Sequence, residues 1–515
     1  MARTAKKEQN LTIDEKLDQA LVPDVEQPFH VPQKWKWCYL RAFSDIKTGK
    51  KDANYGSANG KYFFFTCASE PIRCDGYSFE GKAILLAGNG DISNISLYEG
   101  KFEAYQRTYV LNIVPPLSTE FFYYYFKYRW VDYNINKIFG TAIPYIRLGN
   151  LQDFPVPLPP LAEQQRIVDR IESLFAKLDE AKEKAQAVID GFEDRKAAIL
   201  HKAFTGELTA EWRDTNHVDF ATWKEMPLGN AITAVKDKYD PEKAHLLDVS
   251  YIGLEHLEKG NGITGKGNAT DVKSLKTLFL KGDILYGKLR PYLDKHDVAP
   301  FDGMCSTDIL VYRAERNNSA YFFNYLMSQP NFIRYANSTA KGINLPRTSE
   351  KEISAYKIKL PLPEEQEKIV QMVDVLLGAE KQAKEAAEQV IDQIYAMKKA
   401  ILARAFRGEL GTNDTNDEPA IELLKRVLND SQSNDDLFKP ARKRTTIPKE
   451  IDEKLSTGME RDIIKLFIKA DNNSVSMDTI MAVSSKKFEI LDTLRALEKK
   501  GLIQKIDVEN YSLVE

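Results

Sequence analysis

The longest regular pattern in this sequence is a line of apolar residues that recurs in alternating steps of four and three. One copy of this line runs through residues 158–210 and a second runs through residues 360–411. A mean spacing of about 3.5 residues is typical of the narrow seam of a coiled coil. The pattern predicts two long helices, each about 60 Å in length at about 1.5 Å per residue. The seam positions are Ile167, Ile171, Leu174, Leu178, Ala181, Ala185, Val188, Phe192 and Ile199 in the first copy, and Ile369, Val373, Leu376, Ala383, Ala387, Val390, Ile394, Met397 and Ile401 in the second.

The two copies align without a gap at a shift of 202 residues, so they are a duplicated structural unit. Gly206 and Gly408 follow the last apolar positions and are expected to end the helices. Because the copies are equivalent, an antiparallel pairing with pseudo-two-fold symmetry satisfies both seams alike. In the alternative interpretation each helix packs only on its own globular domain. Arg195 and Glu380 interrupt the seams at what we expect to be different heights, where they would fix the register of the pair.

A globular domain precedes each helix. Residues 33–157 are rich in aromatic residues, and short apolar runs such as Ala83–Ala87 and Tyr109–Val114, bounded by Gly, Asn and Pro, predict strands. Residues 211–359 form the second domain, in which Trp223 and Leu228 repeat the spacing of Trp35 and Leu40. The expected fold class is α+β, with two mixed α/β domains joined by two long antiparallel coiled-coil helices. The helices repeat closely while the domains repeat only in framework, which indicates one common task for the helices and two different tasks for the domains.

The two ends of the chain differ from this repeat. Residues 1–32 are expected to form an arm with a short helix near Thr12–Leu21. Residues 412–445 are expected to be a linker that is flexible or contains a helix, and it carries the basic cluster Lys439–Arg444. In residues 446–515 we expect three helices and a hairpin. This order favours a winged-helix module, and a plain helical docking domain stays open beside it. The expected helices are Met459–Ala470, Met477–Val483 and Lys486–Leu502, and the hairpin joins residues 501–506 to residues 511–514.

Composition narrows the class of protein. The chain has 515 residues, 43% of them hydrophobic, and a net charge of -3, so nucleic-acid binding would have to come from local patches. Residues 33–145 carry 14 Lys and Arg against 10 Asp and Glu, a mild basic bias. There is no apolar run of about 18 residues, so no membrane span is expected, and no apolar stretch follows the basic start, which argues against a secretory signal. The four cysteines form no C-x-x-C pair and are expected to be reduced thiols.

No catalytic motif stands out. The segment Gly260–Lys266 matches glycine-rich phosphate-loop patterns, but Gly267 occupies the place of the Ser or Thr that a P-loop needs, so a glycine-rich hairpin or loop explains it better. The six histidines show no metal-ligand spacing. The tetrapeptide with which an amino-methyltransferase holds its target amine is absent. The sequence therefore predicts no catalytic, cofactor-binding or metal-binding residue in this chain.

The layout resembles that of the specificity (S) subunit of type I restriction–modification systems over about residues 20–412. The resemblance rests on the openings of the two helices, on their A-F-x-G-E-L ends and on the tryptophans that begin the domains, namely Leu158–Gln164 and Leu360–Gln366, Ala203–Leu208 and Ala405–Leu410, and Trp35 and Trp223. It implies that each domain is a target recognition domain for one half of a split double-stranded DNA site. The helices would space the domains and dock two methyltransferase subunits and, through them, restriction and translocase subunits. S-adenosylmethionine, ATP and magnesium would belong to these partners, and the complex would be cytoplasmic in a bacterium or archaeon.

Two segments of the second domain are the best candidates for DNA contact, because sequence-specific proteins read base edges with Arg, Lys, Asn and Gln. The first segment, Gly287–Tyr292, offers Lys288, Arg290 and Tyr292. The second, Lys341–Arg347, offers Lys341, Asn344 and Arg347. We align the second segment with Thr141–Arg147 of the first domain, which adds Tyr145 and Arg147 as candidates. For each residue the alternative is a solvated cation or a core aromatic, and for the whole chain it is a coiled-coil scaffold whose domains bind proteins.

Overall fold

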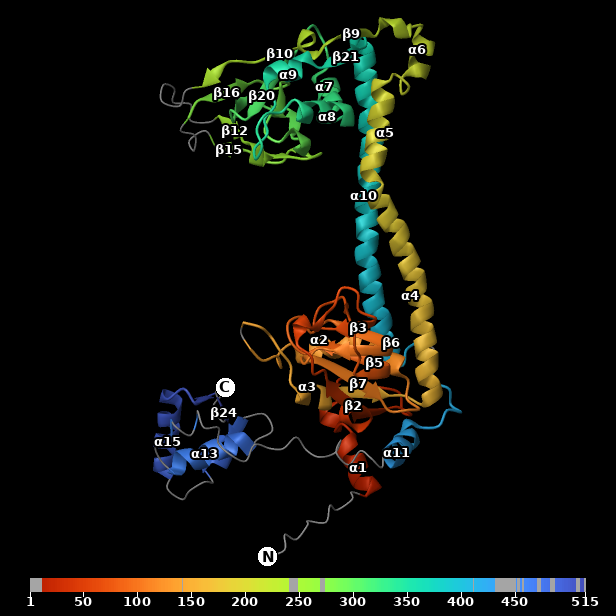
Figure 1. Ribbon diagram of the computed structural model, residues 1–515, viewed down its shortest axis with the longest axis vertical. Coiled ribbons are helices and arrows are strands. Elements are labelled where there is room, and N and C mark those ends of the chain that lie inside the picture. Colours follow the sequence, from red (N-terminus) through yellow and green to blue (C-terminus); the bar gives the residue numbers. More distant parts are fainter. Residues whose placement is uncertain are drawn as a thin grey trace, which may run out of the picture. The chain divides into compact units, whose positions relative to one another are not determined.

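The computed structural model describes residues 12–140, 142–239, 249–268, 274–410 and 412–430, and, nearer the C-terminus, residues 451, 454–455, 458–469, 474–481, 487–505 and 510–513. The chain divides into two compact units (Figure 1). Unit 1 comprises residues 1–175 and 398–515, and unit 2 comprises residues 176–397. Each unit holds one globular domain, the beginning of one long helix and the end of the other. We describe the two units separately and call residues 33–157 domain 1 and residues 211–359 domain 2.

Domain 1 is built on a six-stranded sheet with the strand order β2-β7-β5-β6-β3-β4. All neighbours are antiparallel except β3 and β6. The strands predicted at Ala83–Ala87 and Tyr109–Val114 are confirmed by β5 and β7. A separate two-stranded ribbon pairs β1 with β8 and brings the two ends of the domain together. The strands are β1 (Lys36–Tyr39), β2 (Ser44–Thr48), β3 (Tyr62–Phe65), β4 (Ile72–Cys74), β5 (Phe79–Ala87), β6 (Ile95–Ala104), β7 (Thr108–Ile113) and β8 (Pro155–Leu158).

One aromatic helix, α2 (Thr119–Asn134), fills the core of domain 1 and joins it to the first long helix. Its N-terminus is capped by Ser118, whose Oγ accepts a hydrogen bond from the Phe121 backbone N–H at 3.2 Å. The Ser118 N–H in turn donates to Oε1 of Gln164 at 3.0 Å, near the start of α4 (Leu161–Asp190). The smaller helices of this region are α1 (Ile13–Ala20), η1 (Asp24–Glu26), η2 (Leu40–Ala42), η3 (Ala53–Tyr55) and α3 (Leu148–Gln152).

The end of the second long helix completes the core of unit 1. Phe406, the last residue of α10 (Pro363–Phe406), packs against the rings of Phe121 and Tyr125, with centroid distances of 5.2 and 5.0 Å. The chain then continues into α11 (Ala420–Asp430), a helix within the predicted linker, whose apolar face is buried in the same core. Its first N–H donates to the Lys34 carbonyl at 2.9 Å. The short N-terminal helix is confirmed by α1, which has a capping box between Thr12 and Glu15.

Domain 2 has the same framework but more and shorter strands. A four-stranded sheet has the order β10-β20-β17-β18, and a five-stranded sheet has the order β11-β16-β19-β12-β15. The glycine-rich segment forms the hairpin β13–β14, as expected from its composition. The strands are β9 (Lys224–Pro227), β10 (Ile232–Ala234), β11 (Lys238–Tyr239), β12 (Ser250–Ile252), β13 (Leu257–Glu258), β14 (Gly262–Ile263), β15 (Gly267–Asn268), β16 (Lys276–Phe279), β17 (Ile284–Gly287), β18 (His296–Val298), β19 (Gly303–Cys305), β20 (Ile309–Ala314) and β21 (Lys357–Leu360).

The joint between domain and long helix is repeated in unit 2. Ser319 caps α7 (Ala320–Met327), and its N–H donates to Oε1 of Gln366 at 2.9 Å, as Ser118 does to Gln164 in unit 1. The ribbon β9–β21 repeats the ribbon β1–β8. The remaining helices of unit 2 are α5 (Phe192–Phe204), α6 (Ala210–Asn216), η4 (Phe220–Thr222), η5 (Leu228–Asn230), η6 (Leu254–His256), η8 (Pro291–Leu293), α8 (Pro330–Ser338) and α9 (Glu350–Ala355).

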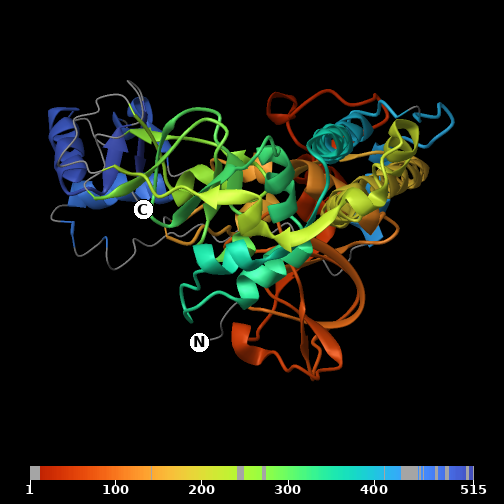
Figure 2. The same ribbon diagram turned by 90° about the horizontal axis from the view of Figure 1, so that it is seen from above.

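In unit 2 the two long helices lie side by side and antiparallel, as predicted. Figure 2 shows α10 end-on with the yellow α5 beside it. Lys182 donates to the Tyr395 hydroxyl at 2.8 Å, and Lys384 lies 5.1 Å from the centre of the Phe192 ring. Residue numbers rise along the first helix from Lys182 to Phe192 while those of their contacts fall, so the two helices run in opposite directions. Gly206 and Gly408 have φ of 80° and 73° just beyond the helix ends, where the left-handed conformation favours glycine.

The seam itself differs in part from the prediction. Ile167, Ile171, Ile369, Val373 and Ile394 are buried, and Leu174, Leu178, Val188, Phe192 and Ile401 are half-buried. The first four of these belong to the domain cores, so each helix begins by packing on its own domain. Leu376 and Val390 are instead 37% and 39% exposed. Their neighbours Leu377 and Ile391 are the more buried members of each adjacent pair. Every second position of the second seam is therefore displaced by one residue over this stretch, while Ala387 and Ile394 stay buried at their predicted positions.

The first long helix is interrupted at Gly191, where the prediction had one continuous helix. Nε of Arg195 lies 2.6 Å from Oε2 of Glu380, and Nη2 of Arg195 donates to the Val188 carbonyl at 2.7 Å. A Cβ at position 191 would lie 2.4 Å from the Arg195 guanidinium, so glycine makes room for this side chain. The expectation that Arg195 and Glu380 sit at different heights was wrong. In the antiparallel pair they meet and bridge the two helices.

The described part of residues 446–515 has the order expected of a winged helix. Three helices are followed by a hairpin, and a short strand between the first two helices joins the sheet, whose order is β22-β24-β23. A buried Glu460 carboxylate accepts from Lys500 at 2.5 Å. The basic cluster Lys439–Arg444 lies outside the described residues. The elements are α13 (Gly458–Lys469), β22 (Ser474–Ser476), α14 (Met477–Met481), α15 (Lys487–Lys499), β23 (Ile503–Lys505) and β24 (Asn510–Leu513).

Candidate nucleic-acid interface

The segment Lys341–Arg347 of domain 2 is a closed hairpin. Its two end residues exchange both backbone hydrogen bonds at 2.9 Å, and Gly342 turns the chain with a φ of 106°. All of its residues are exposed except Pro346, which is half-buried. The hairpin therefore holds a fixed loop of accessible side chains, among them Asn344 and Arg347.

The structure brings the two predicted segments of domain 2 together. The Arg290 N–H donates to the Pro346 carbonyl at 2.7 Å, and the Thr348 N–H donates to the Lys288 carbonyl at 3.0 Å. The loop that follows β17 thus docks on the hairpin through two backbone hydrogen bonds. Side chains of both segments remain at the surface, and Tyr292 is 48% exposed. Sequence reasoning had named these segments separately, 50 residues apart.

Arg290 is held in an unfavourable backbone conformation. Its φ and ψ are 52° and 68°, in the left-handed region that costs a non-glycine residue about 1–2 kcal/mol. Domain 1 makes the equivalent contact with Gly90, whose φ is 72° and whose N–H donates to the Pro144 carbonyl at 2.8 Å. Where domain 1 has the residue suited to this conformation, domain 2 has an exposed arginine. Strain of this kind at an exposed side chain points to a functional role.

Domain 1 has the same hairpin at Phe139–Tyr145. Its end residues exchange backbone hydrogen bonds at 2.9 and 2.8 Å, and Gly140 takes the place of Gly342. This register makes Tyr145 the counterpart of Arg347, so our alignment with Thr141–Arg147 was wrong by two residues. The backbone pairing places the two hairpins at the shift of 202 residues that relates the long helices, whereas Thr141–Arg147 lies at a shift of 200. Thr141 itself lies outside the described residues.

The charges around the two hairpins differ. Arg347 pairs with Asp308 at 3.0 Å, and Lys288 lies 3.9 Å from the same carboxylate. The hydrogen bond from Arg347 holds the pKa of Asp308 below its usual value, so this carboxylate stays ionised at neutral pH. In domain 1 the Arg147 guanidinium lies 3.7 Å above the Phe139 ring and 3.4 Å from the Tyr145 hydroxyl. Domain 2 offers several cations near one acid, and domain 1 offers a cation on an aromatic platform.

A buried polar cluster anchors the far end of the Arg290 loop, and sequence reasoning missed it. Asp294, also left-handed with a φ of 48°, lies 2.9 Å from Nε2 of His296 and 3.9 Å from Nζ of Lys196 on α5. Burial by itself would raise the pKa of Asp294, but the His296 hydrogen bond and the nearby cations lower it below its usual value. One aspartate and one histidine two positions apart carry no recognisable pattern, so the sequence held no signal for this anchor.

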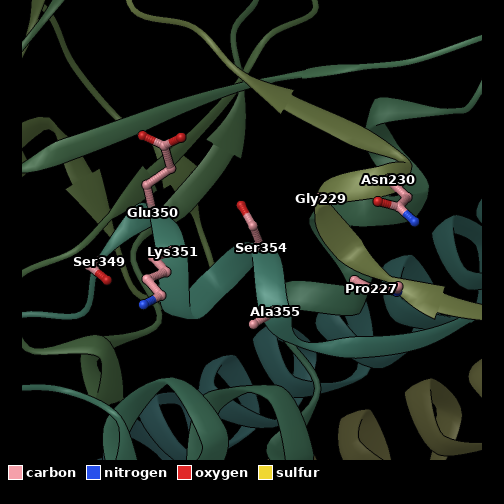
Figure 3. Close-up of a pocket in the computed structure, with 8 residues that line it drawn as sticks. All are labelled: Pro227, Gly229, Asn230, Ser349, Glu350, Lys351, Ser354 and Ala355. Atoms are coloured by element: carbon pink, nitrogen blue, oxygen red, sulfur yellow. The ribbon is translucent and has the colours of Figure 1, made fainter.

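A hollow in domain 2 lies where η5 meets α9, away from the hairpin and the Arg290 loop (Figure 3). Its lining is Pro227, Gly229, Asn230, Ser349, Glu350, Lys351, Ser354 and Ala355. In domain 1 the residue at the place of Gly229 is Arg41, whose guanidinium pairs with Asp153 and reaches the Gln19 carbonyl. We assign the hollow no function.

The arrangement suits the binding of a polyanion more than chemical catalysis. Cations, an amide and aromatic rings on rigid backbone are what base edges and phosphates require. Across the described residues no group of three His, Cys, Asp or Glu side chains is placed to hold a metal ion. In the same part of the chain, no helix has the length and apolar character needed to cross a membrane. The individual DNA-contact residues remain predictions.

Asp308 provides a test of these local charges. We expect Asp308→Asn to tighten non-specific duplex binding by about threefold at low salt, because it removes the one acid beside Lys288 and Arg347. Titration of a fluorescent duplex of arbitrary sequence with the assembled complex measures this. Asp302→Asn is the matched control, since it makes the same charge change at an exposed acid whose carboxylate accepts the Lys281 backbone N–H. Equal effects of the two variants would show a general rather than a local charge effect.

Comparison with known proteins agrees with this geometry. The family model described as the type I restriction modification DNA specificity domain matches residues 32–189 and 221–389. The chain is 32% identical over 414 residues to the type I restriction enzyme EcoDI specificity subunit of Escherichia coli, covering 74% of this chain and 89% of that protein. It is 24% identical to the EcoBI specificity subunit of the same species, over 53% of this chain and 61% of that one.

Two solved structures share the fold. The HsdS subunit from Thermoanaerobacter tengcongensis superposes with a TM-score of 0.50 at 17% identity, over 75% of this chain and all of that one. A chain from a study of complex assembly in the type I R-M system superposes with a TM-score of 0.54 at 17% identity, over 74% of this chain and all of that one. At this identity the likeness concerns the fold alone.

Proposed function

Because this chain belongs to the family of type I restriction enzyme specificity subunits, and so provides the DNA sequence specificity of a restriction–modification complex, we propose that its two domains each read one half of a split DNA site. One observation carries this proposal. The two domains repeat the same backbone platform, a closed hairpin docked on the loop after a central strand, but they place different side chains on it. A shared frame with different side chains is what two different half-sites require.

The long helices are proposed to dock the methyltransferase subunits. The displaced positions of the second seam are exposed on α10. They follow one another at intervals of seven residues, at Leu376, Ala383, Val390 and Met397. A spacing of seven is the heptad of a coiled coil, so this line is suited to receive a helix of a partner. We propose that two methyltransferase subunits bind the pair of helices and that restriction subunits join through them. S-adenosylmethionine, ATP and magnesium are then bound, and catalysis is carried out, by those partners in the cytoplasm.

The test of this function is DNA footprinting with the assembled complex. The chain is co-expressed with the methyltransferase encoded beside it, and the purified complex is probed on DNA from the same cells. We expect protection of two short segments separated by an unprotected or weakly protected spacer. Pull-down of the methyltransferase without any sequence-dependent protection would instead favour the scaffold function.

The C-terminal region is expected to add non-specific DNA affinity through its basic cluster. Deleting residues 437–515 removes Lys439, Arg442, Lys443 and Arg444 with the winged-helix module, whereas deleting residues 446–515 removes the module alone. The first deletion should lower the slope of log affinity against log salt by up to about 3.6, at about 0.9 per phosphate contact. The second should change the slope little, because residues 446–515 carry 11 Lys and Arg against 13 Asp and Glu.

The comparison of the two deletions can contradict this expectation in two ways. Equal losses would assign the DNA affinity to the module instead of the cluster. Unchanged slopes for both deletions, with unchanged stability of the complex, would give this region a role outside DNA binding.

A further inference from the structure

The tips of the two matched hairpins present large apolar side chains to solvent. Ile143 in domain 1 is 61% exposed, and its counterpart Leu345 in domain 2, 202 positions later, is 46% exposed. A second tip residue of domain 2, Ile343, is 99% exposed. A single exposed aliphatic residue is common on protein surfaces and needs no explanation. Here both domains carry an exposed aliphatic residue at the same position of the hairpin that we propose to contact DNA. This repetition calls for an explanation.

The tips cannot fold back to hide these side chains. Each hairpin is closed by two backbone hydrogen bonds and is fastened to the neighbouring loop by two more. A proline follows each matched residue, Pro144 after Ile143 and Pro346 after Leu345, and restricts it to extended conformations. A Cβ at Gly140 would lie 2.7 Å from the Ile143 carbonyl, which shows how tightly the turn is built. The aliphatic groups are therefore held outward by the backbone.

The surroundings of the tips indicate the chemistry of the ligand. The Nη2 atom of Arg290 lies 3.4 Å from the Asn344 carbonyl, so a guanidinium flanks the apolar tip of domain 2 directly. Arg147 flanks the hairpin of domain 1. Cations beside a protruding apolar group match the major groove of duplex DNA, where phosphates line the edges and the thymine C5-methyl group is the apolar feature of the floor.

We propose that Ile143 and Leu345, with Ile343 beside the latter, contact thymine methyl groups in the two half-sites. This inference rests on the proposed function and adds to it the kind of base that each hairpin reads. It requires that each half-site contain at least one A·T pair whose thymine methyl lies under the hairpin. The difference between the tips, one aliphatic group in domain 1 among the described residues and two in domain 2, predicts a larger methyl-dependent contribution in the half-site read by domain 2.

The experiment replaces thymine with deoxyuridine, which removes only the methyl group. The half-sites are first taken from the methylated positions in DNA of cells that carry the complex. Affinities of the complex are then measured for the natural duplex and for duplexes with deoxyuridine in one half at a time. For the unaltered chain we expect a loss of about fourfold per contacted methyl, the factor that corresponds to about 0.8 kcal/mol for one buried methyl or methylene group.

Variants complete the test. In the double variant Ile343→Ala/Leu345→Ala the deoxyuridine effect should vanish in one half-site and persist in the other, and Ile143→Ala should show the reverse. Val25→Ala, an exposed aliphatic residue outside both hairpins, should leave both effects in place. Deoxyuridine that costs nothing, an effect that survives at full size in the Ile343→Ala/Leu345→Ala double variant, or a half-site without an A·T pair would each overturn the inference.

Two further outcomes separate other occupants of the tips. If Leu345→Ala loses DNA affinity although deoxyuridine costs the unaltered complex nothing, the tip inserts between base pairs instead. Failure of the variant complex to assemble would mean that the tip binds a protein subunit. If the unaltered complex recognises no defined sequence, the proposed function fails before this inference is reached, so the two failures are distinguishable.

Discussion

Replacing Glu365 with alanine is expected to destabilise unit 2 by about 3–5 kcal/mol, the usual cost of removing one partner from a buried ion pair. The Glu365 carboxylate is fully buried. It accepts hydrogen bonds from Thr209 and Arg213 at 2.6 Å each and from the Trp223 indole at 2.9 Å. Without it the Arg213 guanidinium, itself almost completely buried, would lose its charged partner.

Hydrogen exchange of the backbone amides in α6 and β9 measures this effect in the full chain, because exchange reports the free energy of local opening. Glu364→Ala is the matched control, since it removes an exposed carboxylate one residue away on the same helix. Glu163→Ala, in the first copy, should cost less, because its partner Arg166 is 37% exposed and stays solvated. Equal protection in the Glu365 and Glu364 variants would contradict the role of Glu365.

The two glutamates reveal how the repeat is assembled. Glu365, near the start of the second long helix, holds the residues that follow the end of the first. Glu163, near the start of the first, accepts the N–H of Asn413, which follows the end of the second, at 2.9 Å. The neighbouring Gln164 and Gln366 hold the capping serines of their own domains. In each Glu-Gln pair the glutamine therefore holds the capping serine of its own domain. The glutamate holds the residues that follow the end of the other long helix.

Replacing Arg290 with alanine is expected to weaken binding of the assembled complex to its specific site by at least about tenfold, the range of a lost base-edge or phosphate contact. Assembly with the methyltransferase should stay intact, because Arg290 is exposed on the hairpin platform and the long helices are unchanged. Arg347→Ala should act in the same direction. Competition titration with specific and arbitrary duplexes at physiological salt provides the measurement.

Arg290→Gly separates the side chain from the backbone. It should lose the same DNA affinity as the alanine variant, but it should unfold no more easily than the unaltered chain, because glycine relieves the left-handed strain of about 1–2 kcal/mol. Arg334→Ala is the control, an exposed arginine on α8 outside both segments. Unchanged affinity in Arg290→Ala and Arg347→Ala would remove both residues from the interface.

The sequence pattern predicted the architecture well because its strongest signals are local. The alternation of four and three along the long helices and the glycines after their ends each act within a few positions. The duplication then predicted the same arrangement of domain and long helix in both halves of the repeat. The helix–helix–helix–hairpin order of the C-terminal module came from the same kind of signal.

The wrong predictions have a common cause. They concern residues whose position depends on contacts with segments far away in the sequence. Leu376 is followed by Leu377 and Val390 by Ile391, so either member of each pair could face the other helix. Contact with the other helix selects the second. In the same way, the polar anchor of Asp294 and His296 exists only in three dimensions.

The central claim, that each domain reads one half of a split site, is tested most directly by mapping methylated bases in the DNA of cells that carry this chain with its methyltransferase. We expect a motif of two short specified segments separated by a spacer of unspecified bases. Exchange of residues 211–359 for the corresponding domain of a relative should change one segment and leave the other as it was. A single uninterrupted motif, or a change in both segments after this exchange, would contradict the account.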